Sequence, residues 1–364
     1  MAKKSSKRPV KSRRKKALPV VITILIIILF AAWYLFGKPY IVPDEQGLML
    51  VMTEEPIVPI FEEREESIAP STPSTGSGTA TAGKVGVNKN ISNDSADLGY
   101  AENSSLYFGN PTDAFADTSY DTNYLMIKPQ YTLSYNSQTL CPNWVAWHLD
   151  TENMGEADRS DDFRPDSQLP ENWYGVKKAD YQYNKYGFDR GHVCPSADRT
   201  ATKEDNSMTF LMTNMVPQTP DNNRVIWMHF ENYERQLVTQ GNEVYIIAGP
   251  YGSGGTSPKG TFENIPISLK SGQTLYMNVP AYTWKVLIAI PSGENDLDRI
   301  DASATVIAIN VPNQTGMQKN GDWEQFICSI DDIEAMTGYD FFELLPYDIE
   351  DDLEAKVYER SRGP

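Results

Sequence analysis

The run Asp189-Arg190-Gly191-His192 combines side chains that could act on a phosphodiester. A neutral imidazole is a good base near pH 7 and can take a proton from an attacking water. Arg190 offers a planar set of donors that matches phosphate geometry, and Gly191 leaves room for close approach of backbone or substrate. Asp189 could orient the imidazole or hold Arg190. A turn that merely contains a histidine would look the same, so the run by itself defines only a candidate site.

A second candidate group lies about 30 residues further on, where Asn223, Trp227, Glu231 and Arg235 recur at four-residue steps. On an α-helix Asn223 and Glu231 differ by about 80° and can share one face. An amide oxygen and a carboxylate suit Mg²⁺, which keeps several waters and takes few protein ligands. The same spacing also fits an ordinary solvated helix face with a Glu231–Arg235 ion pair.

The elements that must position these groups follow from hydrophobic patterning. Thr219-Pro220-Asp221 has the cap, first-position proline and first-turn acid of a helix start, and this helix is expected to stop at Gly241. A short second helix should end at Gly338. Four segments have the apolar, β-branched and aromatic character of buried strands: 144–149, 243–252, 284–291 and 304–312. Strands with interspersed helices of unequal size predict an α+β fold.

The N-terminal part of the chain predicts a membrane anchor. Residues 18–36 are uncharged and almost wholly apolar, long enough as a helix to cross the hydrocarbon core. The preceding basic segment, 1–17, should stay in the cytoplasm by the positive-inside rule, which places the rest of the chain on the outer, periplasmic or extracellular side. A cleaved signal peptide is the competing interpretation, although the apolar stretch is longer than usual for one.

The remaining boundaries follow from composition. Residues 37–105 contain a long stretch rich in Ser, Thr, Gly and Pro, which predicts a flexible linker. Aromatic residues return after it, so we expect one folded domain at 106–350 and an acidic, polar tail at 351–364.

Charge and cysteine content narrow the functional classes. The net charge is −17, although the first 16 residues carry nine basic side chains and no acid. An acidic protein attracts the negatively charged nucleic-acid backbone poorly, so a phosphate-binding site in this chain needs positive charge placed locally at the site. The three cysteines, Cys141, Cys194 and Cys328, lack zinc-site spacing. They allow one disulfide with a free thiol, or three buried thiols.

Taken together, FDRGHVCPSADR and TNMVPQTPDNNRVIWMHFENYER resemble the DNA/RNA non-specific endonucleases. These enzymes belong to the ββα-metal (His-Me finger) class and include mitochondrial endonuclease G. The likeness extends more loosely over about 107–346. It implies a mixed, largely antiparallel central sheet flanked by helices, with a ββα-metal motif at the active site.

The resemblance also implies roles for individual residues. His192 would be the general base, Asn223 the direct ligand of Mg²⁺ (with Mn²⁺ able to substitute), and Glu231 would hold the waters around the metal. Arg190 and Arg235 would contact the scissile phosphate. Asn214 matches a supporting position, and Asp189 completes the motif.

The resulting prediction is a membrane-anchored, Mg²⁺-dependent endonuclease that cuts DNA and RNA with low sequence specificity. Two alternatives share the fold: a nucleic-acid-binding module without activity, and a phosphodiesterase acting on another surface polymer. An anchored interaction protein with an acidic binding face is a third. A homodimer and a protein inhibitor are both compatible with the sequence, which specifies neither.

Overall fold

The computed structural model describes residues 39–44, 47–52, 101–317 and 320–359. Its centre is a seven-stranded sheet in which every neighbouring pair of strands is antiparallel. Most neighbouring strands in this sheet are also consecutive in sequence, but the strand at 141–149 pairs with the strand at 242–251 across a long insertion. From one edge to the other the strands are β15 (Ile327–Cys328), β14 (Thr305–Pro312), β13 (Tyr282–Pro291), β8 (Asn242–Tyr251), β5 (Cys141–Leu149), β4 (Thr132–Asn136) and β3 (Tyr124–Ile127).

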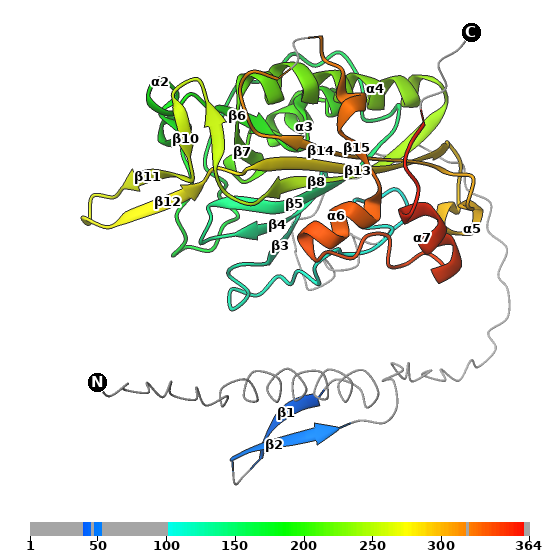
Figure 1. Cartoon of the computed structure of the whole chain (residues 1–364), viewed down its shortest axis with the longest axis horizontal. Coiled ribbons are helices and arrows are strands. Elements are labelled where there is room, and N and C mark those ends of the chain that lie inside the picture. Colours follow the sequence, from blue (N-terminus) through cyan, green and yellow to red (C-terminus); the bar gives the residue numbers. More distant parts are fainter. Residues whose placement is uncertain (1–38, 45–46, 53–100, 318–319, 360–364) are drawn as a thin grey trace, which may run out of the picture. The chain divides into compact units, whose positions relative to one another are not determined.

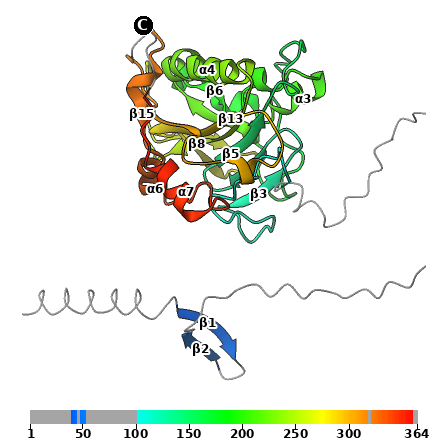
Figure 2. The same ribbon diagram turned by 90° about the vertical axis from the view of Figure 1, so that its right-hand side faces the viewer.

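The central strands are buried on both faces because a layer covers each side of the sheet. Side chains alternate between the two faces along a strand, so on β13 Leu287 and Ala289 join one core cluster and Val286 and Ile288 join the other. Helix α4 (Met228–Thr239) covers the first face, whereas α6 (Ile330–Thr337) and α7 (Tyr347–Glu354) cover the second. Figure 1 and Figure 2 show these three layers.

The predicted strands and helix ends are confirmed. All four predicted segments lie in the central sheet, as β5, β8, β13 and β14. The short second helix is α6, and its C-cap Gly338 has the left-handed φ of 74° that glycine adopts readily.

The helix predicted after Thr219 has two parts. The Thr219 hydroxyl accepts from the Asn222 backbone N–H at 3.3 Å, as expected of a helix cap. The first part, η6 (Asn222–Trp227), is a π-helix, and α4 continues it without a break to Thr239. A π-helix is wider than an α-helix, so the 100° per residue of the sequence argument does not hold across this segment.

Shorter elements surround these layers. The hairpin strands are β6 (Asp189–His192), β7 (Met215–Gln218), β9 (Gly255–Ser257), β10 (Gly260–Phe262), β11 (Asn264–Ser268) and β12 (Thr274–Asn278). The short helices are η3 (Lys178–Tyr181), α2 (Tyr183–Tyr186), η4 (Ser196–Asp198), α3 (Lys203–Met208), η5 (Met212–Asn214), α5 (Asp296–Arg299) and η7 (Trp323–Phe326). The β11–β12 hairpin projects from one end of the domain in Figure 1.

The predicted membrane helix at 18–36 and the basic segment before it lie outside the described residues. In the part of the chain that the structure describes, no helix is long and apolar enough to cross a membrane. The longest α-helix, α4, has 12 residues, or about 18 Å against the roughly 30 Å of a bilayer core.

Two predicted segments without regular structure need correction. Within 37–105, β1 (Pro39–Asp44) and β2 (Gly47–Met52) form an antiparallel pair. The predicted C-terminal tail begins inside α7, where Leu353 is buried in the core because the helix packs on α6.

The cysteines are free thiols. Cys141 and Cys194 are buried and Cys328 is half-buried, which excludes the disulfide alternative and comes close to the three buried thiols.

Candidate active site

The Asp189–His192 run is strand β6, and it pairs antiparallel with β7. Because side chains alternate along a strand, Arg190 and His192 lie on one face of this hairpin and Asp189 and Gly191 on the other. Gly191 is required by close packing. A Cβ added there would lie 1.8 Å from the Oε1 of Gln218, which is buried on the partner strand.

Asn214 fixes the strand end beyond His192. Its Oδ1 accepts from the Cys194 backbone N–H at 2.9 Å, and its Nδ2 donates to the Cys194 carbonyl at 2.8 Å and to the Thr209 carbonyl at 2.9 Å. Both groups of the buried amide are therefore satisfied by backbone. Asn214 therefore holds in place the segment that follows the histidine.

The imidazole of His192 lies in an aromatic pocket and is only 8% exposed. Its ring packs edge-on against Phe210, with centroids 4.7 Å apart, and against Phe163 at 5.6 Å. Its Nε2 is buried and has no hydrogen-bond partner within the described part of the chain. Burial, followed by the charges of Arg159 and Arg190, lowers the pKa of His192 to about 3. The ring is therefore neutral at physiological pH, the protonation state that a base requires.

Three cations lie over the same aromatic rings. The Arg190 guanidinium is 4.6 Å from the centre of Phe163, where Lys178 also lies at 5.3 Å, and Arg159 is 4.8 Å from the centre of Phe210. Such cation–π contacts hold charged groups beside the ring faces. Nε of Arg190 is buried without a hydrogen-bond partner. The face that carries His192 is therefore locally positive in an acidic chain.

Asp189 does not bond to His192 or Arg190, the partners suggested from the sequence. Its carboxylate instead accepts from Arg224 at 2.6 and 2.8 Å and from Nδ2 of Asn223 at 3.1 Å. These bonds join β6 to the π-helix η6. They also orient the Asn223 amide by its nitrogen, so that the oxygen stays available for another ligand.

Glu231 and Arg235 lie on α4, one turn apart. Burial raises the pKa of Glu231 to about 8, while Lys285 and Arg235 act to lower it. Arg235 donates to Oδ1 of Asp198 at 2.6 Å and to the Asn232 side chain at 2.7 Å. The alternative interpretation, an ion pair between Glu231 and Arg235, is not formed among the described residues, because the hydrogen bonds of Arg235 go to Asp198 and Asn232.

The positioning residue for Arg235 was missed by sequence reasoning. Asp198 is fully buried, and its second oxygen accepts from Nε1 of Trp147 at 3.0 Å. It follows the Asp189–His192 run by only a few residues, in the segment DRGHVCPSAD. Arg159 and Phe163 were also missed, and they come from a loop with no motif that could have identified them.

A buried ion pair supports α4 from beneath. Lys285 and Glu234 are both fully buried, with Nζ 3.0 Å from Oε1. The ammonium lies 4.5 Å from the centre of the Trp227 ring and 5.3 Å from that of Trp147. This pair ties the helix to β13. Its two members act in opposite directions on Glu231, whose pKa Lys285 lowers and Glu234 raises.

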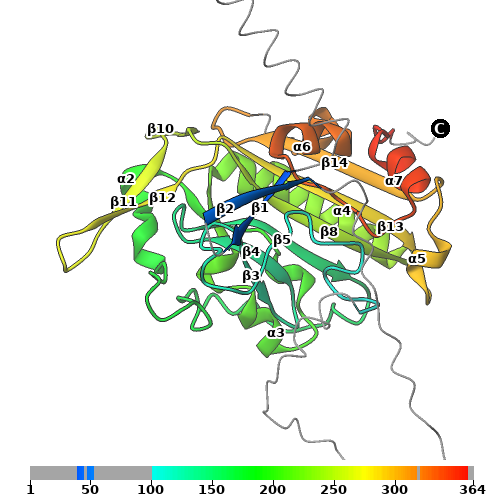
Figure 3. The ribbon, with the colours of Figure 1, turned by 90° about the horizontal axis from the view of Figure 1, so that it is seen from below.

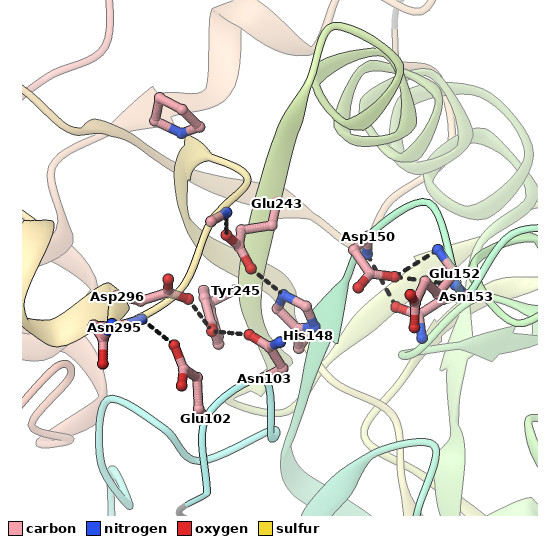
Figure 4. A network of polar contacts seen from close by, with 12 residues as sticks. Glu102, Asn103, His148, Asp150, Glu152, Asn153, Glu243, Tyr245, Asn295 and Asp296 are labelled. Carbon is pink, nitrogen blue, oxygen red and sulfur yellow. Dashed lines mark hydrogen bonds and ion pairs between the residues drawn. The ribbon is translucent and has the colours of Figure 1, made fainter. Parts of the chain in front are cut away.

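The other two histidines lie away from this site. His148 is buried on the opposite face of the sheet, where its Nε2 is 3.0 Å from Oε2 of Glu243. Figure 4 shows the surrounding network, in which Glu243 also accepts from the Gly293 backbone at 2.9 Å and Tyr245 bonds to Asp296. These groups satisfy one another, as expected of a structural histidine. His229 is exposed on the outer side of α4.

Comparisons with known proteins agree with this geometry. The sequence pattern of the DNA/RNA non-specific endonucleases matches residues 109–348. A protein of Nostoc sp. named "Nuclease" is 45% identical over 252 residues, which cover 69% of this chain and 85% of that protein. The zebrafish protein "Nuclease EXOG, mitochondrial" is 30% identical over 241 residues, 65% of this chain and 64% of its own.

A solved structure of the EndoG/EndoGI complex matches with a TM-score of 0.51 at 22% identity, covering 67% of this chain and 92% of that one. This likeness shows the shared fold, a mixed α+β architecture with a large antiparallel sheet.

The predicted localisation needs correction. The zebrafish relative, its human counterpart and a yeast relative are named mitochondrial nucleases. These findings contradict a single-pass membrane protein with an outer catalytic domain.

What the comparisons show is the family: the chain is a member of the DNA/RNA non-specific endonucleases, and hence a nuclease, an enzyme of the hydrolase class.

Proposed function

We propose that this nuclease is a Mg²⁺-dependent endonuclease that hydrolyses DNA and RNA with low sequence specificity. The observation that carries the proposal is the set of bonds from Asp189 to Asn223 and Arg224. They join the hairpin that bears a neutral, unpartnered His192 to the helix that bears Asn223 and Glu231. The hairpin and this helix would together form the ββα-metal motif.

The residues present fit a hard divalent cation. The Asn223 amide is held through its nitrogen, which leaves its oxygen for a ligand. A half-buried carboxylate with a raised pKa, Glu231, follows on the same helix run. Mg²⁺ favours such a small set of oxygen donors completed by water. We therefore assign Asn223 as the direct ligand and Glu231 as the group that orients the surrounding waters. When bound, the cation would polarise the phosphate and offset its developing charge; Mn²⁺ could substitute.

His192 is the proposed general base. Its lowered pKa keeps the ring unprotonated, and Nε2 has no protein partner to compete with a water. The packed rings of Phe210 and Phe163 restrict the orientation of the imidazole. The residue can therefore take the proton of an attacking water without first breaking a protein hydrogen bond.

Arg190 and Arg235 are the proposed phosphate contacts. Each guanidinium is positioned by a neighbour, Phe163 for Arg190 and Asp198 for Arg235. Preorganised donors stabilise charge that builds on phosphate oxygens in the transition state. Asp189 acts as a positioning residue for Asn223 rather than in the chemistry.

The test is cleavage of supercoiled plasmid and of RNA by the purified chain, with Mg²⁺ or with EDTA. We expect nicking and RNA degradation that EDTA abolishes, and a loss of roughly 10²–10⁴-fold in His192→Ala. His148→Ala is the control for removal of a histidine away from the site. Equal cutting by the His192→Ala and wild-type proteins would remove the proposed base. Binding of DNA without cutting would favour a nucleic-acid-binding module.

A further inference from the structure

A second cluster of chemically capable side chains lies on the far side of the sheet from His192. Carboxylate oxygens of Asp331, Glu334 and Glu354 lie within 4.8 Å of one another. Asp331 and Glu334 belong to α6, and Glu354 is the last residue of α7. Figure 3 shows these two helices side by side, and they pack together. Three acidic groups in proximity are not by themselves a binding site.

Glu354 is the most buried of the three acids. This side chain is 7% exposed, and its Oε1 is buried without a hydrogen-bond partner among the described residues, while the carboxyl group is in hydrogen-bond contact with that of Glu334. Glu354 also ends α7, where the helix dipole disfavours negative charge. A buried carboxylate at a helix C-terminus needs either a proton or a cation.

Among the described residues, no positively charged side chain pairs with this cluster. The groups that surround Glu354 are themselves acidic: Glu334, Glu350, Asp340 and Asp331. Along the described segments none of these five groups forms an ion pair.

The nearest lysine in the sequence points elsewhere. Lys356 donates to the carbonyl of Ala302. The Glu334 carboxyl, for its part, accepts from the Phe341 backbone N–H at 2.7 Å, which fixes one of its oxygens. One oxygen of the cluster is therefore fixed by the backbone, and no positively charged side chain among the described residues pairs with the three acids.

We propose that Asp331, Glu334 and Glu354 form a structural calcium site that joins α6 to α7. Ca²⁺ takes several carboxylate oxygens with flexible geometry, whereas Mg²⁺ demands near-ideal octahedral geometry and gives up its water reluctantly. The absence of His and Cys from the cluster disfavours zinc. Asp331 is exposed, so an ion and its remaining waters can enter from solvent.

This site is separate from the proposed active site. The central sheet lies between the two, with β6, the strand that carries His192, on one side and α6 and α7 on the other. Glu354 also falls outside residues 109–348, the segment that matches the nuclease family. The cation would thus stabilise this chain's C-terminal helix rather than take part in hydrolysis.

The experiment measures thermal unfolding of the purified full chain with CaCl₂ or with EDTA. Asn223→Ala serves as the background, because it removes the proposed active-site ligand. At about 100 times the dissociation constant, Ca²⁺ should raise the Tm of this background by about 5–10 °C. Adding Glu354→Gln should abolish the shift. Adding Asp352→Asn, an exposed acid on the same helix, should preserve it.

Isothermal titration with CaCl₂ provides the second measurement. One site should be seen in Asn223→Ala and none once Glu354→Gln is added. Asp331→Asn alters only an exposed ligand, so it tests the site even if Glu354→Gln folds poorly, and it should weaken binding at least tenfold. The absence of a Tm shift in Asn223→Ala would overturn the proposal. So would an equal shift with and without Glu354→Gln.

Discussion

Substitution of Asp198 by Asn tests whether Arg235 must be held in place. Asp198 is fully buried, and its two oxygens accept from Arg235 at 2.6 Å and from Trp147 at 3.0 Å. An amide has only one acceptor oxygen, so the change leaves one buried donor unpaired and removes the charge opposite Arg235. Breaking such a pair should cost about 3 kcal/mol, or about 6–12 °C in Tm for a domain of this size.

The catalytic effect should be mediated by Arg235. Loss of one preorganised donor costs about 10²–10³-fold in rate, so Arg235→Ala sets the limit that Asp198→Asn should approach. If Asp198 acts only through Arg235, the double variant should be no slower than Arg235→Ala.

The assay is the initial rate of plasmid nicking at saturating Mg²⁺, below the Tm of every variant, with kcat and KM determined separately. The control is Glu204→Gln, which also removes one negative charge but at an exposed position on α3. This variant should keep the wild-type rate. Multiplying losses in the double variant would refute the reasoning. A wild-type kcat for Asp198→Asn would refute it as well.

Three further outcomes follow from the site. Gly191→Ala should lower the unfolding free energy by about 1–3 kcal/mol, because its Cβ would overlap Gln218; urea unfolding should show recovery when Gln218→Ser is added. The pKa of His192 is lowered to about 3 in the folded protein. The free energy of unfolding therefore contains a contribution from the neutral imidazole that is complete above about pH 6.5, the ordinary pKa of histidine. This contribution is lost as the pH falls toward 3, at up to about 1.4 kcal/mol per pH unit. His192→Gln should flatten that slope in urea titrations between pH 4 and 6, and an unchanged slope would contradict the assignment. Asp189→Ala should raise the Mg²⁺ concentration for half-maximal nicking about 10–100-fold, since Asn223 loses its anchor; an unchanged requirement would argue against that role.

Local patterning was sufficient for much of the fold. Runs such as 284–291 are apolar on both faces because layers cover both sides of the sheet, and such runs predict buried strands. Thr219 and Gly338 marked helix ends because caps depend on nearby backbone alone.

The parts that could not be predicted depend on contacts distant in sequence. The π-helix is one example: Asn222, at its start, donates to the Thr283 hydroxyl at 2.8 Å on β13. A helical wheel contains no such bond, and it assumes a uniform 3.6 residues per turn. The partners of Asp189 and Arg235 were missed for the same reason, since Arg224 and Asp198 are brought to them by the tertiary fold.

The acidic composition, which argued against nucleic acid as a substrate, is reconciled with the site by where the charges lie. Around His192 the described cations Arg159, Arg190 and Lys178 rest on Phe163 and Phe210. The acidic cluster of Asp331, Glu334 and Glu354 lies on the far side of the sheet, on α6 and α7. Phosphate would therefore meet positive charge at close range, while the acidic remainder weakens long-range attraction. Such an arrangement favours weak, fast-releasing encounters. If DNA affinity proved high and the cleavage rate insensitive to ionic strength, this explanation of the charge distribution would fail.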